Sequence, residues 1–132
     1  MKVIDSSTLV KFFSKEEGWE KVGEVIGEGV VTLDLTIKEV ANALWKKVLR
    51  GEMSEDVSVK ILSDLVNGEA IKIVSQEEYL IDAFRIAVKE KITVYDALFI
   101  SLAKTKGIEL VTSDKKQYEV ALKEGLNASI LV

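Results

Sequence analysis

Met1-Lys2-Val3-Ile4-Asp5-Ser6-Ser7, residues 1–7, is the stretch that decides the fold. Its Lys2-Val3-Ile4 run ends in two β-branched apolar residues, which is typical of a short strand. From Ser6 onward the apolar residues recur at helical spacing, so the chain passes directly from a strand into a helix. Asp5 therefore stands immediately after the end of the first predicted strand.

The alternation of strand and helix continues along the sequence. Further strands are predicted at Val30–Leu33, Ile71–Val74 and Glu109–Thr112, with a fifth at Ser129–Val132. Strands that alternate with helices favour an α/β fold with a parallel sheet flanked by helices. Because no linker, low-complexity tract or convincing repeat interrupts the pattern, we expect residues 1–132 to form a single domain. The helical patterns cover about 19–26, 36–49, 54–66, 76–89, 94–106 and 115–124.

Two absent residue types narrow the chemistry. The sequence has no Cys, which excludes disulfides, thiolate metal sites and cysteine nucleophiles. It also has no His, which excludes a Ser-His-Asp relay and a His-ligated zinc site. Carboxylates, hydroxyls, Lys, Arg and Tyr remain for catalysis. Carboxylates are hard oxygen ligands, and they suit Mg²⁺ or Mn²⁺.

Charge and hydropathy set further limits. The formal net charge is −4, so a nucleic acid would have to bind through local basic patches or a bound cation. Apolar runs such as Ala97–Ile100 are far too short to span a membrane, and Asp5 stands where a signal peptide would stay apolar. We therefore expect a cytoplasmic protein. Abundant Lys and Glu are typical of a thermophilic source.

Four acidic residues stand where this fold brings distant segments together. Asp5 and Asp114 follow the first and fourth strands, and ligands of an open parallel sheet bind beyond the carboxyl ends of its strands. Glu39 and Asp96 are predicted in the first turns of two helices, and such helices begin at the same edge of the sheet. The sequence therefore predicts that all four carboxylates face one edge.

Helix capping is the competing explanation for these acids, because Asp and Glu favour helix N-termini in any protein. Thr36-Ile37-Lys38-Glu39 has the spacing of a capping box, and Asp96 stands at the corresponding place after Thr93. Asp5 and Asp114 each have neighbouring serines that offer other caps, which favours function for these two. Co-location alone does not separate the explanations, because the helix N-termini of this fold gather at that edge.

Four short segments carry the acids in a characteristic order and spacing. They are Val3-Ile4-Asp5-Ser6-Ser7, Glu39-Val40-Ala41-Asn42-Ala43-Leu44, Val94-Tyr95-Asp96-Ala97-Leu98 and Val111-Thr112-Ser113-Asp114. Each is too short to be specific alone, but together they span nearly the whole chain. In this arrangement the sequence resembles the PIN-domain nucleases, and in particular the small VapC-type toxins.

The resemblance implies a PIN-like, doubly wound α/β domain whose parallel sheet has the strand order 3-2-1-4-5. It also implies the activity of an endoribonuclease. The substrate would be single-stranded RNA or tRNA, hydrolysed at its phosphodiester bonds with Mg²⁺ or Mn²⁺. The resemblance also implies the toxin of a type II toxin–antitoxin pair, with a small antitoxin packed over helices 36–49 and 54–66, and a homodimer. The catalytic acids that it implies are Asp5, Glu39, Asp96 and Asp114, and the supporting residues are Ser7, Asn42 and Thr112.

Carboxylates brought this close repel one another, by about 4 kcal/mol for each pair about 4 Å apart at an effective dielectric near 20. A divalent cation relieves the repulsion and makes a bound water acidic enough to attack a phosphodiester. We expect Asp5 and Asp96 to be the most direct metal ligands and Asp114 to complete the site. Glu39 would act through a metal-bound water or as a general base.

Basic residues near these acids are candidates for contacts to RNA phosphates. Lys115 and Lys116 follow Asp114 directly, and Lys11 lies on the first predicted helix. The competing explanation is a solvated charged face, which any of these residues would also suit. Further candidates are Lys46, Lys47 and Arg50.

Two other classes of α/β protein do not fit the sequence, and two related functions remain open. A receiver-type signalling domain needs an Asp at the tip of its third strand, where this chain has Ile73-Val74-Ser75. A dinucleotide-binding domain needs a G-x-G-x-x-G loop, which is absent. A non-catalytic interaction module of PIN-like fold would share the architecture without the reaction. A housekeeping RNA-processing enzyme or a structure-specific DNA nuclease would share the chemistry.

Overall fold

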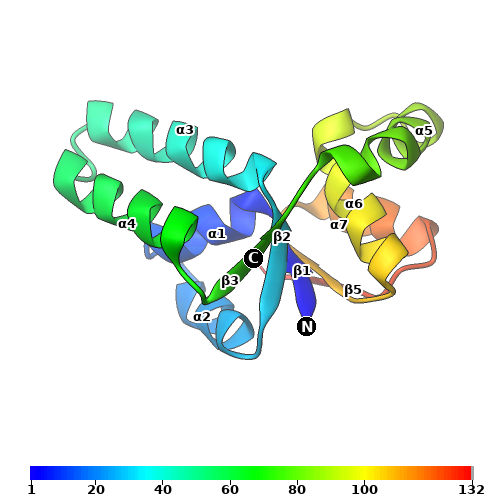
Figure 1. Cartoon of the computed structure of the whole chain (residues 1–132), viewed down its shortest axis with the longest axis horizontal. Coiled ribbons are helices and arrows are strands. Elements are labelled where there is room, and N and C mark those ends of the chain that lie inside the picture. Colours follow the sequence, from blue (N-terminus) through cyan, green and yellow to red (C-terminus); the bar gives the residue numbers. More distant parts are fainter. Residues whose placement is uncertain (132) are drawn as a thin grey trace.

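The computed structural model describes residues 1–131, and they follow the predicted alternation of strands and helices (Figure 1). The strands are β1 (Lys2–Ile4), β2 (Val30–Leu33), β3 (Ile71–Val74), β4 (Leu110–Thr112) and β5 (Ala128–Ile130). A 3₁₀ turn at Glu77–Tyr79 precedes α5. The α-helices are α1 (Ser6–Phe13), α2 (Trp19–Gly27), α3 (Leu35–Leu49), α4 (Glu55–Asn67), α5 (Leu80–Glu90), α6 (Val94–Lys106) and α7 (Lys115–Lys123).

All five strands are parallel and form one sheet in the order β3-β2-β1-β4-β5, which confirms the predicted fold class and strand order. β1 is central, and the chain builds outward from it in both directions. Val3 pairs with Val31 on one side and with Leu110 on the other. The strand order therefore reverses between β1 and β4, and such a switch point opens a crevice beyond the carboxyl ends of the two strands.

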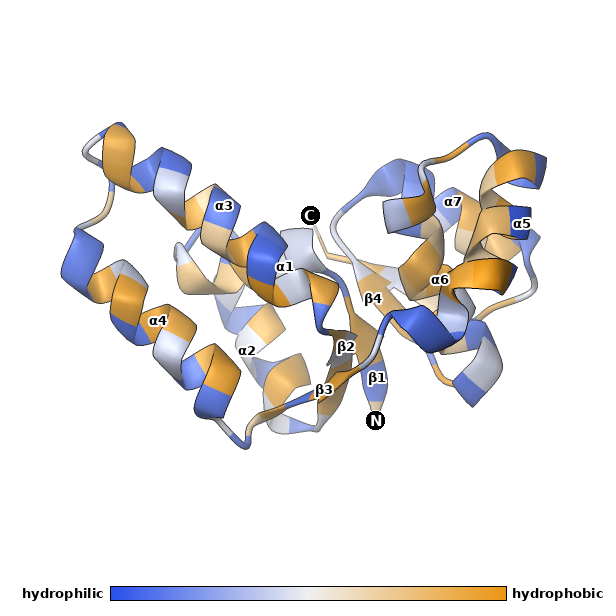
Figure 2. Ribbon diagram, turned by 45° about the horizontal axis from the view of Figure 1, so that its top comes forward, coloured by the Kyte–Doolittle hydropathy of each residue, from blue (hydrophilic) through white to orange (hydrophobic). Residues whose placement is uncertain are grey.

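Helices cover both faces of the sheet, with α1 to α4 on one side and α5 to α7 on the other (Figure 1). Successive residues of a strand point to opposite faces, so Ile4 packs with Leu9 and Leu44 whereas Val3 packs with Ile100. The ribbon coloured by hydropathy shows apolar strands between the helical layers (Figure 2). None of the helices in residues 1–131 is long and apolar enough to cross a membrane.

The capping-box spacing of residues 36–39, which was the competing explanation for Glu39, does not form a capping box in the structure. Helix α3 begins at Leu35, and the residue before it is Asp34. The Asp34 backbone N–H donates to the Val74 carbonyl at 2.9 Å, and its carboxylate accepts from the Gln76 N–H at 3.0 Å. Contacts to the end of β3 therefore fix where α3 starts, and Thr36 is buried with its hydroxyl against Thr32.

Two other predicted boundaries also differ from the structure. The helix predicted over 76–89 is divided into the 3₁₀ turn and α5, which continues to Glu90. The fifth strand was predicted at Ser129–Val132, but it runs over Ala128–Ile130, and Val132 lies outside the described residues. Its register with β4, which pairs Val111 with Ser129, sets these bounds.

Leu44→Ala is expected to lower the free energy of unfolding by about 2–5 kcal/mol, because Leu44 is fully buried and the truncation leaves a cavity. Leu49→Ala on the same helix is the matched control, since this side chain is 67% exposed and its loss should change stability by less than about 0.5 kcal/mol. Urea denaturation of both variants measures the difference. Equal stabilities would contradict the packing described for α3.

Candidate active site

A small cavity of about 110 Å³ opens at the carboxyl ends of β1 and β4, where the strand order reverses. The structure places all four predicted acids around it. They come from the ends of β1 and β4 and from helices α3 and α6, so four distant segments of the chain meet there. The lining residues are Asp5, Ser6, Ser7, Glu39, Asp96, Phe99, Asp114 and Gln117.

The Asp5 carboxylate is buried and accepts several hydrogen bonds. One oxygen accepts from the Thr8 backbone N–H at 3.0 Å and from the Thr8 hydroxyl. The other accepts from the Ser7 hydroxyl at 2.9 Å and from the Thr112 hydroxyl at 2.7 Å. Asp5 itself caps α1, and the neighbouring serines that the sequence offered as alternative caps do not take this role.

Asp114 is also the N-cap of its helix. Its carboxylate accepts from the Gln117 backbone N–H at 2.9 Å, and its own N–H donates to the Thr112 hydroxyl at 3.0 Å. Ser113 was available in the sequence, but the extended backbone at Asp114 places the aspartate at the helix start. Capping and a position on the cavity therefore coincide in the same side chains.

Helix capping was the main competing explanation for Glu39 and Asp96, but the contacts of these two acids differ from those of Asp5 and Asp114. Glu39 is the fifth residue of α3, so it lies just beyond the predicted first turn, and it accepts a hydrogen bond from the Ser6 hydroxyl of α1. Asp96 lies in the first turn of α6, but the cap is Thr93, whose hydroxyl accepts from the Asp96 N–H at 3.2 Å. Neither carboxylate is the N-cap of its helix.

Burial raises the pKa of three of these acids. Loss of hydration is the largest cause for Asp5, and its hydrogen bonds from Thr8, Thr112 and Ser7 oppose the rise only partly. For Glu39, burial comes first, the Ser6 hydroxyl opposes it, and the charges of Asp96 and Asp5 add to it. For Asp96, burial and then the charge of Asp114 raise the pKa. The cavity therefore concentrates negative charge that is poorly compensated.

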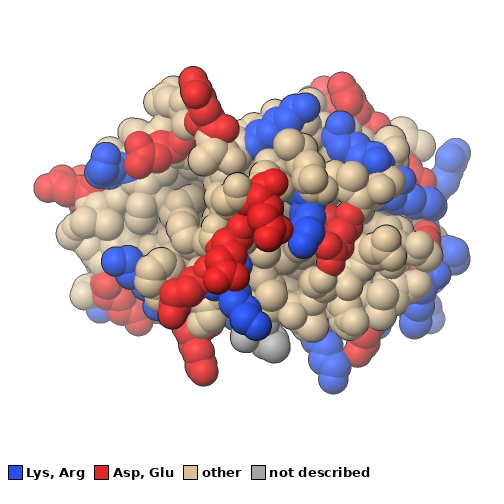
Figure 3. Space-filling model, turned by 90° about the horizontal axis from the view of Figure 1, so that it is seen from below, with Lys and Arg blue, Asp and Glu red and all other residues tan. Residues whose placement is uncertain are grey.

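The opposite edge of the sheet shows how acids behave when cations neutralise them. Figure 3 views this side, where acidic side chains run across the face with basic ones beside them. Lys2 pairs there with Glu28 at 3.8 Å and with Glu109 at 3.3 Å. The Ser129 hydroxyl and then Lys2 lower the pKa of Glu109. Among residues 1–131, none of the ion pairs involves an acid of the cavity.

Gln117 is a site residue that sequence reasoning missed. It is 1% exposed, and its side-chain amide donates to the Asp96 backbone carbonyl at 3.0 Å. Its Oε1 is buried and accepts no hydrogen bond within the described part of the chain. The signal in the sequence was its position three residues after Asp114, where a cap and the first helical turn meet. Ser6, Thr8 and Phe99 were missed as well.

The side chains around the cavity offer oxygen ligands, which are the type that a hard divalent cation prefers. Carboxylate oxygens surround the cavity, and the unpaired Gln117 Oε1 adds an amide oxygen. As the side chains stand in residues 1–131, however, no three acids converge closely enough to hold a metal ion. Mg²⁺ usually binds through one or two carboxylates and keeps several of its waters, so it does not require three converging acids.

The other predicted residues are divided between the cavity and its surroundings. Ser7 and Thr112 contact Asp5 directly. Asn42 does not line the acid cavity and lies instead in a second cleft along α3. Lys11 donates to the Leu131 carbonyl at 3.2 Å, so its ammonium group is already engaged. Lys115 and Lys116 are exposed in the first turn of α7.

The parallel sheet with acids around its switch point defines a class of α/β domain with a carboxylate-lined centre. The PIN domain model matches residues 2–123, and the chain belongs to this family. It is 38% identical over 120 residues to "Ribonuclease VapC3" of Pyrobaculum aerophilum, which covers 89% of this chain and 92% of that protein. It is 29% identical over 114 residues to "Exonuclease VapC9" of the same organism, covering 86% and 80%.

Solved structures share the fold. The crystal structure of PAE2754 from Pyrobaculum aerophilum superposes with a TM-score of 0.72 and 27% identity, covering 96% of this chain and 89% of that one. A toxin–antitoxin complex from Klebsiella pneumoniae gives a TM-score of 0.63 at 17% identity, covering 89% and 90%. The second likeness speaks for the fold alone.

Glu39→Gln is expected to raise the free energy of unfolding at neutral pH when divalent cations are absent. Burial holds the pKa of Glu39 above its usual value, so the folded protein binds this proton more tightly than the unfolded chain. The stabilising effect of protonation is complete below the unfolded pKa, near ~4.3, and is lost as the pH rises through the folded pKa. The variant cannot ionise there, so its advantage should grow with pH.

Urea denaturation in EDTA from about pH 4 to about pH 7.5 tests this sign. Glu119→Gln gives a matched control, because Glu119 is exposed on α7 and does not line the cavity. A Glu39→Gln protein that is less stable than the wild type at neutral pH would contradict the charge balance described for the cavity.

Proposed function

We propose that this protein is a Mg²⁺- or Mn²⁺-dependent endoribonuclease that hydrolyses phosphodiester bonds of single-stranded RNA or tRNA. The single observation that carries the proposal is one cavity lined by Asp5, Glu39, Asp96 and Asp114, without an ion-paired cation in residues 1–131. Membership of the PIN family and likeness to a protein named a ribonuclease support the reaction class. An RNA substrate also favours a cytoplasmic location.

Asp5, Asp96 and Asp114 would hold the cation, because their carboxylates line one cavity from three different elements, and binding would have to draw them closer together than they stand here. When bound, the cation supplies Lewis acidity: it lowers the pKa of a water and balances negative charge on the phosphate. Ser7, Thr8 and Thr112 fix the Asp5 carboxylate in one orientation through their hydrogen bonds. Because these oxygens already accept four hydrogen bonds, ligation by Asp5 would require one of these donors to turn away from it.

Glu39 is suited to take a proton from the attacking water. Its carboxylate is half-buried, its pKa is raised, and the Ser6 hydroxyl orients it. A carboxylate with a raised pKa is a better base than an exposed one, and its value lies closer to neutral pH. Gln117 Oε1, which has no partner among the described residues, can accept a hydrogen bond from a water or a ribose hydroxyl in the cavity.

Asp5→Asn is expected to lower metal-dependent RNA cleavage by at least about 100-fold, the order seen when a group that stabilises the transition state is lost. Asn caps helices as well as Asp, so α1 should keep its start and the circular dichroism spectrum its shape. Asp64→Asn is the control, since Asp64 is an exposed acid of α4 outside the cavity. Cleavage of a labelled single-stranded RNA in Mn²⁺, Mg²⁺ or EDTA measures the effect.

Undiminished metal-dependent cleavage by Asp5→Asn would remove the proposal. An RNA labelled at one end and another labelled internally also separate an endonuclease from an exonuclease, the second candidate that the name of the relative VapC9 favours. A single-stranded DNA of the same sequence tests the remaining choice of substrate. Absence of cleavage together with absence of Mn²⁺ binding would favour a non-catalytic interaction module.

We also propose that the protein is the toxin of a type II toxin–antitoxin pair. Helices α3 and α4 form an apolar cleft of about 470 Å³, in which Trp45 and Val59 are more than half exposed. An apolar helix from a small antitoxin fits such a groove by burying these side chains. The resemblance to VapC-type toxins, which the match to "Ribonuclease VapC3" supports, favours this partner.

The proposed homodimer would use the outer face of α5, defined here as Ile81, Phe84 and Val88, which are each more than half exposed. Glu77 and Glu78 precede this face, and Lys91 follows it. Two copies packed antiparallel along α5 would bury the apolar residues and set the acidic start of one helix against the basic end of the other. Opposite charges at the rim fix such a register.

Val59→Asp and Phe84→Asp are reciprocal variants that test the two surfaces. Val59→Asp is expected to abolish co-purification with the protein encoded by the neighbouring reading frame and to leave the dimer intact. Phe84→Asp is expected to give a monomer that still binds this protein, because a charge on one apolar surface does not reach the other. Size-exclusion chromatography with light scattering reads both results. If both variants behave like the wild type, the proposals for both surfaces are wrong.

A further inference from the structure

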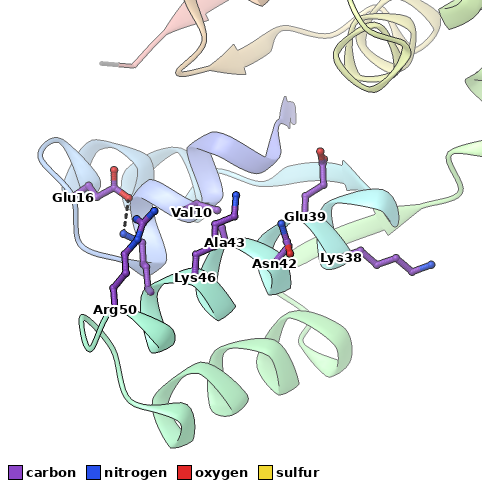
Figure 4. Close-up of a pocket in the computed structure, with 9 residues that line it drawn as sticks. Val10, Glu16, Lys38, Glu39, Asn42, Ala43, Lys46 and Arg50 are labelled. Carbon is purple, nitrogen blue, oxygen red and sulfur yellow. Dashed lines mark ion pairs between the residues drawn. The ribbon is translucent and has the colours of Figure 1, made fainter.

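A second cleft, of about 490 Å³, runs along α3 and away from the acid cavity (Figure 4). Glu39 lines both hollows, so the cleft begins where the four acids meet. Val10 on α1 and Glu16 just beyond that helix contribute to its other wall. The remaining lining residues are Lys38, Asn42, Ala43, Lys46, Lys47 and Arg50.

Four residues that line this cleft are set at regular intervals along α3. Glu39, Ala43, Lys46 and Arg50 are separated by four, three and four residues, so they share one face of the helix. From Glu39 to Arg50 this face extends about 17 Å at 1.5 Å per residue. Figure 4 shows Asn42 and the basic side chains beyond it on the side of α3 that faces α1.

Positive charge in the cleft is largely uncompensated. Lys47 pairs with Glu16 at 3.7 Å. None of the ion pairs within residues 1–131 involves Lys38, Lys46 or Arg50. All three are exposed, although the protein as a whole has a formal net charge of −4. Basic side chains that lie in one row without acidic partners create a local positive potential, which attracts a ligand with several negative charges.

We propose that this cleft binds the phosphate backbone of single-stranded RNA on one side of the bond that is cut. The inference deepens the proposed nuclease function and rests on it, because it gives the substrate of the acid cavity a path along α3. Lys46 and Arg50 bind successive phosphates, Asn42 donates to a phosphate or ribose oxygen nearer the acids, and Lys38 acts at the mouth. These are substrate-binding residues and take no part in the chemical step.

The composition of the cleft favours RNA over an acidic peptide. Four of its nine lining residues, Lys38, Lys46, Lys47 and Arg50, are basic, which gives a phosphate backbone several charged partners along the cleft. The opposite side of α3 differs in charge, since the cleft between α3 and α4 is lined by Leu44, Trp45 and other large apolar side chains and by no Lys or Arg. Helix α3 thus separates a surface suited to protein from one suited to phosphates.

The position of the cleft also orients the RNA strand relative to the acid cavity. A strand that leaves the cavity along α3 places its scissile phosphate at the acids and its next phosphates at Asn42, Lys46 and Arg50. Electrostatic grooves that follow a backbone hold single strands without reading their sequence. The cleft therefore contributes affinity and alignment, and its loss should raise KM far more than it lowers kcat.

The test measures binding of a short fluorescein-labelled oligouridylate by fluorescence anisotropy in EDTA, where no cleavage takes place. Lys46→Gln/Arg50→Gln is expected to bind roughly tenfold more weakly than the wild type, because charge-assisted contacts to phosphate are lost. The slope of log K against log [KCl] should fall by about 1.4, which is about 0.7 for each phosphate contact to a single strand. Both side chains are exposed, so the fold is retained.

Lys106→Gln/Lys123→Gln is the matched control, with the same change of charge at the exposed ends of α6 and α7. Wild-type affinity and salt slope in the α3 variant would overturn the inference, as would an equal loss in the control. The inference would also be overturned if the α3 variant kept its affinity for RNA but no longer bound the protein encoded by the neighbouring reading frame. The cleft would then bind a protein. Binding through the cleft without metal-dependent cleavage would uphold the inference and reject the nuclease proposal alone.

Discussion

The buried Asp5 carboxylate is the interaction on which the rest of the site depends. It caps α1, accepts the Thr112 hydroxyl at the end of β4, and lies at the end of the central strand β1. One side chain therefore ties two strands and a helix at the point where the sheet order reverses. A buried carboxylate is stable only when its oxygens are hydrogen-bonded, and here hydroxyls and one backbone N–H provide these bonds.

This arrangement leaves the cavity with a charge imbalance that packing does not remove. Loss of hydration raises the pKa of Asp5, Glu39 and Asp96, and the charges of neighbouring acids raise it further for Glu39 and Asp96. At the opposite edge of the sheet, by contrast, Lys2 forms an ion pair with Glu109 and helps to lower its pKa, so acids outside the cavity are neutralised by cations. Stored repulsion of this kind at a crevice favours binding of a cation.

Helix α3 organises the surroundings of the cavity. It presents Glu39 to the acids, a row of basic and polar side chains to the cleft beside α1, and apolar side chains to the cleft shared with α4. A helix has room for three such functions because its side chains radiate around the axis. The start of α3 is fixed by contacts between Asp34 and the end of β3, so the sheet sets the position of all three surfaces.

The sequence by itself determined the element order and the edge at which the acids gather, because strand and helix periodicities are local and parallel strands end at one side. At Asp5, Asp114 and Thr36 the sequence offered alternative caps and could not choose among them, because side chains from other elements compete for the same donors. Gln117 was missed for the same reason, since its contact with the Asp96 carbonyl joins residues of different helices. Hydrogen bonds between distant segments exist only after the sheet has formed, and so the tertiary structure alone decided which polar groups meet.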